Sequence, residues 1–172
     1  MGGVQFPPAV NYHYLGVGDN PGWFAGNTGS RSITFQIDSL SNIMEHLGHP
    51  YIDILKMDVE GSEWSTVDAL IRDHGGVLAQ IGHILIEIHL AGSISPDKEW
   101  SDVVRMVEQL EDAGFRLVCH EPLDSNDKLH DKSNGGPDLN EMSFVNKNWV
   151  GALDMRHDGC WAELQTRVEG AK

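Results

Sequence analysis

Two pairs of side chains in this sequence have the types and the spacing that acid–base or metal chemistry requires. Asp58 and Glu60 lie two residues apart, directly after an apolar run and directly before a glycine. Glu87 and His89 lie two residues apart near the end of a second apolar run. A histidine and several carboxylates can bind a divalent metal ion or remove a proton from a hydroxyl group. These four residues are therefore candidate catalytic residues, and the identity of any metal stays open.

Both pairs follow segments that the sequence predicts to be strands. Residues 51–57 and 81–90 are nearly continuous apolar runs, a pattern typical of strands buried on both faces. Ligands of open α/β sheets bind outside the carboxyl ends of the strands, so side chains at two neighbouring strand ends share one crevice. We expect Asp58 to project into this crevice and Glu60 to lie in the turn before the next helix.

A structural role is the alternative for each of these residues. Glu60 and Glu63 could simply complement the start of a helix, which attracts a carboxylate by about 0.3–1 kcal/mol. We favour this interpretation for Glu63. A histidine at a strand end is more often structural than catalytic, and its convergence with a second strand end only brings the two interpretations level. For Asp58 we favour function, because a charge at the end of a buried strand is costly without a partner.

The rest of the chain alternates between predicted strands and helices. Residues 22–32 are rich in glycine and indicate a loop or hairpin tip, and Ser95 predicts the start of a helix that stops at Gly114. Further strands are expected at 11–17, 33–37, 115–119 and 142–145, and further helices at 38–48 and 62–74. This order predicts an α/β fold of parallel βαβ units with right-handed crossovers and helices on both faces of the sheet. We expect a short lead at 1–10, one domain at 11–147 and a tail at 148–172.

Composition excludes several classes of partner. The chain has 172 residues, 40% of them hydrophobic and 22% charged, which is typical of a globular domain with a sizeable core. Its formal net charge of −14 repels phosphate backbones, so we expect no nucleic-acid partner. Basic residues are few and scattered, which argues against an anionic membrane surface. We find no apolar run long enough to cross a bilayer and no signal peptide, so we expect a cytoplasmic protein.

The run DILKMDVEGSE, residues 53–63, resembles the "LLKIDVEGAE" signature of FkbM-type methyltransferases. Three shorter segments resemble the same family in the right order, at residues 15–19, 37–40 and 84–89, and the resemblance covers residues 12–145. It implies a Rossmann-like class I methyltransferase fold. It also implies S-adenosylmethionine as cofactor and transfer of a methyl group to a hydroxyl oxygen of a small-molecule acceptor, such as a sugar.

The resemblance also implies roles for individual residues. Asp58 would lie where the methionine end of the cofactor meets the acceptor, so it is a candidate for cofactor binding as well as for catalysis. Gly18 and Asp19 would lie near the adenine. Glu87 and His89 would lie near the acceptor pocket. A divalent metal ion is compatible with these residues but is not implied by the resemblance.

One difference from the family shapes our further expectations. Family members begin with two βα units that carry a glycine-rich turn and an acidic ribose ligand, and this chain begins just before the third strand. We therefore expect an N-terminally incomplete sheet, in which an exposed edge favours self-association. A non-catalytic remnant or interaction domain is an alternative. Glycoside hydrolysis is another, since Asp53, Asp58 and Glu60 echo a chitinase pattern, although Lys56 replaces an acid and a barrel needs about 250 residues.

Overall fold

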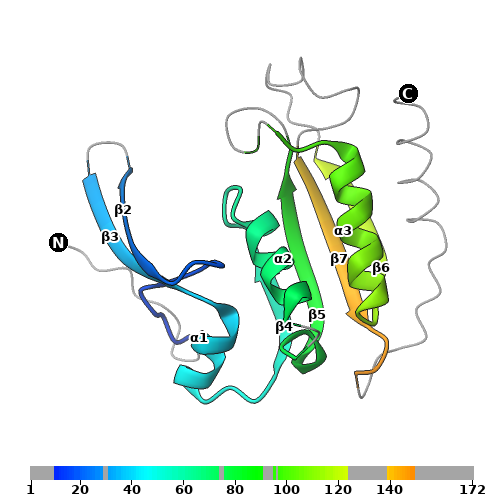
Figure 1. Cartoon of the computed structure of the whole chain (residues 1–172), viewed down its shortest axis with the longest axis horizontal. Coiled ribbons are helices and arrows are strands. Elements are labelled where there is room, and N and C mark those ends of the chain that lie inside the picture. The colour runs from blue at the N-terminus through cyan, green and yellow to red at the C-terminus, as the bar shows by residue number, and fades with distance from the viewer. Residues whose placement is uncertain are drawn as a thin grey trace.

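A computed structural model of the whole chain describes residues 10–28, 31–73, 76–90, 95, 97–123 and 139–149. These residues form two β-sheets, three α-helices and a short 3₁₀ helix, which establishes an α/β protein (Figure 1). The predicted lead at 1–10 and tail at 148–172 lie mostly outside the described residues. No described helix has the length and apolar character needed to span a membrane.

The small sheet has the strand order β1-β3-β2. Its elements, with the helix that follows, are β1 (Leu15–Val17), β2 (Gly22–Thr28), β3 (Arg31–Asp38) and α1 (Leu40–Leu47). β2 and β3 form an antiparallel pair, and β1 lies parallel to β3. The prediction of a loop or hairpin tip over 22–32 is therefore wrong for residues 22–28 and 31–32, which lie in the paired strands of this hairpin. Their glycines indicate a loop, but the backbone pairs along β3 and Phe24 packs against Phe35 with ring centroids 5.1 Å apart.

The large sheet has the strand order β4-β5-β7-β6. Its elements are β4 (Ile52–Met57), α2 (Glu63–Arg72), η1 (Leu78–Gln80), β5 (Ile81–His89), α3 (Trp100–Asp112), β6 (Phe115–Leu123) and β7 (Leu139–Asn146). β4 and β5 are parallel, which confirms the predicted β4–α2–β5 unit, while β7 runs antiparallel between β5 and β6. α2 and α3 contact each other on one face of this sheet (Figure 1), whereas we expected helices on both faces.

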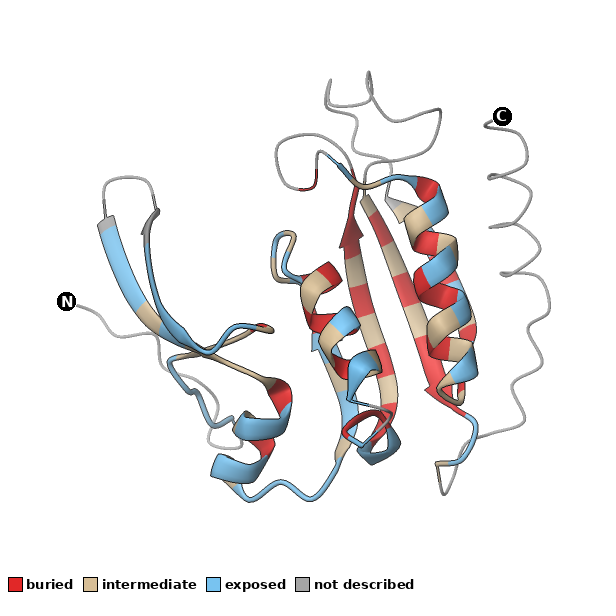
Figure 2. Ribbon diagram, viewed as in Figure 1, coloured by how far each residue is buried: buried red, intermediate tan, exposed pale blue. Residues whose placement is uncertain are grey.

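The main core lies between this sheet and the two helices. Figure 2 shows buried residues on the facing sides of α2 and α3 and along β5 and β7. Alternate residues of β5, which are Ile84, Ile86 and Ile88, are almost completely buried in this core. Burying one such side chain contributes about 1.5–3 kcal/mol, so β5 is held firmly in the middle of the sheet.

β4 differs from the prediction of a strand buried on both faces. Among the described residues it pairs with β5 alone, so its other edge is open. Ile54 keeps 61% of its surface exposed, and Tyr51, just before the strand, keeps 56%. The prediction failed because an apolar run shows only that its side chains favour burial. It does not show whether a second strand lies beside it.

The helix expected to begin at Ser95 begins five residues later. α3 starts at Trp100, and the carboxylate of Asp102 accepts a hydrogen bond of 2.9 Å from the backbone N–H of Glu99. This contact satisfies one of the backbone groups that a helix start leaves unpaired. Gly114, with φ of 102°, follows the helix and confirms the predicted stop.

Candidate functional site at the ends of β4 and β5

The predicted convergence of acidic and histidine side chains is present in the structure. The register of the parallel pair places Met57 opposite Ile86, so Asp58 and Glu87 follow at the same level of the sheet. His89 lies on the same face as Glu87, two residues further along β5. Asp58, Glu87 and His89 each offer one ligand atom, and these three atoms all lie within 4.8 Å of one another. We call these three residues the strand-end cluster.

His89 is held in a defined orientation by a buried carboxylate. Only 7% of the histidine is exposed, and its Nδ1 atom lies 3.1 Å from Oε1 of Glu63. An ionised carboxylate only accepts hydrogen bonds, so Nδ1 donates to Glu63, and in the neutral ring the lone pair lies on Nε2. Nε2 lies 3.6 Å from Oε1 of Glu87 and 3.6 Å from Oε2 of Glu60. Nε2 of His89 therefore faces the carboxylates of Glu60 and Glu87.

Glu63 is the residue that the sequence analysis undervalued. It is fully buried at the start of α2, and its carboxylate accepts backbone hydrogen bonds from Val59 at 3.0 Å and from Gly61 at 2.6 Å. Three donors, counting the imidazole, stabilise the charge of this buried side chain. We predicted its role at the helix start, but nothing in the sequence indicated its contact with a histidine 26 residues away.

Glu60 lies in the turn after β4, as predicted, but it does not cap the helix. Its backbone has φ of 52°, the left-handed region that costs a non-glycine residue about 1–2 kcal/mol. Its side chain is 72% exposed and points its carboxylate toward His89. The backbone N–H groups of the turn are taken by Glu63 instead.

The carboxyl group of Glu87 is a weaker acid than usual because it is partly buried among other carboxylates. Its side chain is only 16% exposed. Burial raises its pKa from the ordinary value of 4.5, and the nearby carboxylates of Asp58 and Glu141 raise it further, while His89 and Lys56 act in the opposite direction. A carboxyl group with a raised pKa is better suited to accept a proton near neutral pH.

Glu141 is a further acidic neighbour that the sequence did not suggest. It lies on β7 directly opposite Glu87, and it pairs with Lys56 of β4 at 3.5 Å. It was missed because nothing in the sequence indicated that β7 inserts beside β5. Its charge adds to the field at Glu87, since the two carboxylates face each other across the ladder.

Trp64 contacts the same site from α2. Its indole Nε1 donates a hydrogen bond of 3.0 Å to the carbonyl oxygen of His89. The Nζ atom of Lys98 lies 5.1 Å from the centroid of the indole ring, a distance suited to a cation–π interaction. The indole thereby fixes the end of β5.

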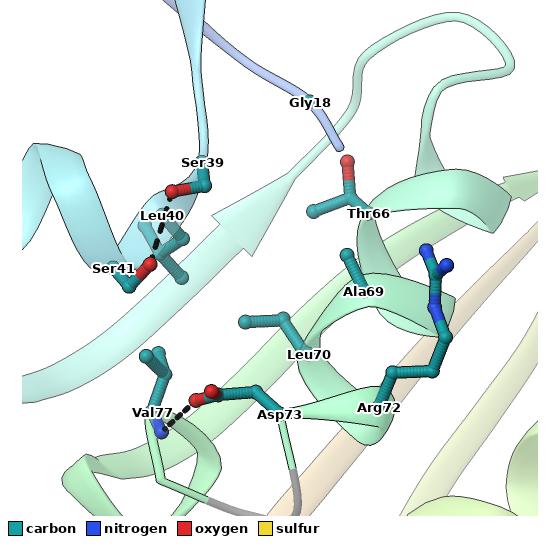
Figure 3. Close-up of a pocket in the computed structure, with 10 residues that line it drawn as sticks. All are labelled: Gly18, Ser39, Leu40, Ser41, Thr66, Ala69, Leu70, Arg72, Asp73 and Val77. Carbon is teal, nitrogen blue, oxygen red and sulfur yellow. Dashed lines mark hydrogen bonds between the residues drawn. The ribbon is translucent and has the colours of Figure 1, made fainter. Parts of the chain in front are cut away.

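A separate cavity of about 320 Å³ lies between α2 and the segment that joins the small sheet to α1 (Figure 3). It is lined by Gly18, Ser39, Leu40, Ser41, Thr66, Ala69, Leu70, Arg72, Asp73 and Val77. The hydroxyl of Thr66 is buried and has no hydrogen-bond partner among the described residues. A ligand in this cavity could supply the missing partner.

The three residues predicted to bind the cofactor do not lie together. Gly18 and Asp19 lie at or beside the cavity, and Asp58 lies in the strand-end cluster. Gly18 lines the cavity, and a side chain there would approach Ile37 Cγ2 to 2.8 Å, so the position requires glycine. Asp19 lies next to it, with its Oδ2 atom 4.0 Å from Nη2 of Arg72. Asp58 belongs to the strand-end cluster instead.

The fold and the site together define an α/β protein with polar chemistry at the ends of two parallel strands. Residues 11–117 match the methyltransferase FkbM domain, which is more than half of the chain. The chain therefore belongs to the FkbM methyltransferase family. This membership gives no support to the glycoside hydrolase alternative.

Two curated proteins resemble the chain. It is 35% identical over 117 residues to the human protein "Probable methyltransferase-like protein 24", an alignment that covers 64% of this chain and 31% of the human protein. It is 39% identical over 83 residues to the rat protein of the same name, covering 45% of this chain and 22% of the rat protein. The chain thus spans less than a third of the length of these relatives. No solved structure matches it.

Proposed function

We propose that the chain forms the acceptor-binding and catalytic part of a Rossmann-like methyltransferase. The enzyme uses S-adenosylmethionine and methylates a hydroxyl group of a small molecule or a sugar. Family membership supports methyl transfer, and the parallel β4–α2–β5 unit supports the Rossmann-like arrangement. The observation that carries the proposal is the convergence of Asp58, Glu87 and His89 at the ends of two neighbouring parallel strands.

The cavity beside Gly18 supports a role in holding part of the cofactor. Gly18 lines this cavity, and the hydroxyl of Thr66, unpaired among the described residues, is available to a polar ligand. Asp19, next to Gly18, supplies an acceptor for an amino group. When bound, S-adenosylmethionine supplies a methyl group attached to a positively charged sulfur. Asp58 would favour that positive charge at the methionine end.

The strand-end cluster has the parts of a general base. A hydroxyl oxygen is a poor nucleophile until its proton begins to leave. Nε2 of His89 accepts the proton of the acceptor hydroxyl, and the carboxylate of Glu63 at Nδ1 stabilises the imidazolium that results. Glu87, beside His89, can accept a hydrogen bond from a second polar hydrogen of the methyl acceptor and keep that molecule oriented. Removal of the proton would leave the oxygen free to bond to the methyl group as the bond between methyl and sulfur breaks, with S-adenosylhomocysteine as the leaving group.

Binding and turnover measurements test this proposal in turn. Titration calorimetry with S-adenosylhomocysteine is made on the chain and on any longer natural form that contains it. Methyl transfer from labelled S-adenosylmethionine is then followed across a panel of hydroxylated sugars and small alcohols. His89→Gln should lower the rate by about 10²–10⁴-fold. The control, Glu108→Gln on the exposed side of α3, should leave it unchanged. Failure of every folded form to bind S-adenosylhomocysteine would contradict the proposal.

A further inference from the structure

We propose that Asp58, Glu87 and His89 form a binding site for a divalent transition-metal ion, with Mn²⁺ as its best-matched probe. Nothing in the family membership assigns a metal to this chain. The inference rests on the donor set, on the orientation of the histidine and on the local charge, which are three separate observations.

The donor atoms have the chemistry and nearly the spacing of a metal site. Two carboxylate oxygens and one imidazole nitrogen lie within 4.8 Å of one another. Donors that share an ion at about 2.1 Å lie roughly 3–4 Å apart, so small side-chain rotations bring the three atoms to coordinating distance. Carboxylates suit Mn²⁺ and imidazole suits the later first-row ions, so the mixed set favours a transition metal over Mg²⁺ or Ca²⁺.

The histidine is arranged as metal-binding histidines are. It is more than nine-tenths buried, and its Nε2 atom lies 3.6 Å from the carboxylates of both Glu60 and Glu87, which is longer than a hydrogen bond. Its other nitrogen is bonded to buried Glu63. A carboxylate on the far nitrogen of a metal-binding histidine fixes the tautomer and strengthens the ligand. Nε2 of this buried ring is therefore directed at the carboxylates of Glu60 and Glu87, and in the neutral ring its lone pair is available to an ion.

The charges around the cluster favour a cation. Asp58, Glu60 and Glu141 are acidic neighbours of Glu87 and His89. Lys56 is the nearby base, but its ammonium group pairs with Glu141 and its side chain is more than half exposed. Asp58 and Glu60 are exposed, so water screens part of the repulsion among these carboxylates, and a divalent ion would offset the rest. The exposed carboxylate of Glu60 can serve as a fourth donor, which leaves positions open for water or substrate.

The open positions give the ion a role that rests on the proposed function. With the ion bound, Nε2 of His89 is a ligand and no longer the base. An acceptor hydroxyl bound to the ion would lose its proton more readily, to the exposed carboxylate of Glu60 or to water, since a metal ion lowers the pKa of a coordinated O–H group. Binding of the ion itself does not depend on that function. The two ideas can therefore fail separately.

The test uses the full chain after treatment with a chelator and its removal. Mn²⁺ binding is followed by the loss of the electron paramagnetic resonance signal of free Mn²⁺, at physiological ionic strength. Co²⁺ absorption then reports nitrogen coordination. We expect one strong site per chain. Asp58→Asn and Glu87→Gln should each weaken binding by at least about tenfold, a loss typical of perturbed metal sites. His89→Gln should abolish the nitrogen-dependent part of the Co²⁺ spectrum.

The matched control is Asp53→Asn, which removes an exposed carboxylate from the same strand outside the cluster. It should bind Mn²⁺ as the unmodified chain does. Equal weakening by Asp53→Asn and Asp58→Asn, or no saturable site at all, would overturn the metal site. Circular dichroism checks that each variant is folded, and Glu87→Gln provides a second variant if one of the others is not. Metal binding without S-adenosylhomocysteine binding would overturn the proposed function alone, and the reverse result would overturn the metal site alone.

Discussion

β4 and β5 are neighbouring parallel strands of similar apolar composition, but the protein uses them in different ways. β5 is paired on both edges and packs Ile84, Ile86 and Ile88 into the core. β4 is paired on one edge among the described residues and leaves Ile54 mostly exposed. Both strands still deliver acidic side chains to one site at their carboxyl ends. The difference shows that a strand can position side chains of a candidate site without being buried on both faces.

The largest expected contrast is between two isoleucine truncations. Ile86→Ala removes a buried side chain from β5 and should lower the free energy of unfolding by about 2–5 kcal/mol. Ile54→Ala on β4 should cost less than about 1 kcal/mol, because its side chain already contacts water. Urea unfolding followed by circular dichroism measures both. Similar losses for the two variants would show that β4 is covered in solution.

A second contrast compares two acidic residues at helix starts. Glu63→Ala leaves two backbone N–H groups and the Nδ1 of His89 without their acceptor in a buried site, so it should cost about 2–3 kcal/mol. Asp102→Ala removes a capping contact near the surface and should cost about 1 kcal/mol. The same unfolding measurement applies. Equal effects would mean that the buried hydrogen-bond network of Glu63 adds nothing beyond an ordinary cap.

The pH dependence of stability tests the environment of Glu87. Its pKa is raised in the folded chain, so the folded state takes up a proton more readily than the unfolded state does. Stability is therefore lost as the pH rises from the ordinary value of 4.5 through the raised pKa. Glu87→Gln should be more stable than the unmodified chain at neutral pH, and this gain should disappear below the ordinary pKa.

Thermal unfolding across pH, with a chelator present, measures this difference. Asp53→Asn, on the exposed β4, corrects for the loss of one negative charge from the chain. A gain for Glu87→Gln that is constant from acidic to neutral pH would contradict the raised pKa. A loss of stability at neutral pH would contradict it as well.

The smallest expected effect concerns the ion pair between β4 and β7. Lys56 and Glu141 lie 3.5 Å apart, and both side chains are about half exposed. Such pairs contribute little, so Lys56→Gln should change the free energy of unfolding by less than about 0.5 kcal/mol. A double-mutant cycle with Glu141→Gln isolates the pair. A coupling energy well above 1 kcal/mol would place the pair in a drier setting than its exposure indicates.

The site was predictable to the extent that it follows from local chain order. Parallel strands place their carboxyl ends at the same edge of a sheet, so the spacing of Asp58, Glu87 and His89 behind apolar runs was enough to predict their convergence. The partners of these residues were not predictable in the same way. Glu63 and Glu141 contact them through the packing of α2 and the insertion of β7, which depend on pairings between distant segments.

In the fold, too, features set by nearby residues were predicted, and features set by distant segments were not. Stop signals such as Gly114 act locally, so the end of α3 was predicted correctly. The glycine-rich β2 became a strand because β3 lies beside it, and the apolar β4 stayed exposed because one side has no described neighbour. Both errors concern the presence or absence of a partner strand. A single sequence contains no direct record of that property.

The hydrogen bond from Trp64 to the backbone of His89 has a practical consequence. The indole lies between the end of β5 and the ammonium group of Lys98, so its fluorescence reports any rearrangement of the histidine or its neighbours. A paramagnetic ion nearby would also quench that emission through space. Comparing the unmodified chain with Trp64→Phe would isolate this signal from the other tryptophans. The molecule thus contains its own optical sensor for events at the strand ends.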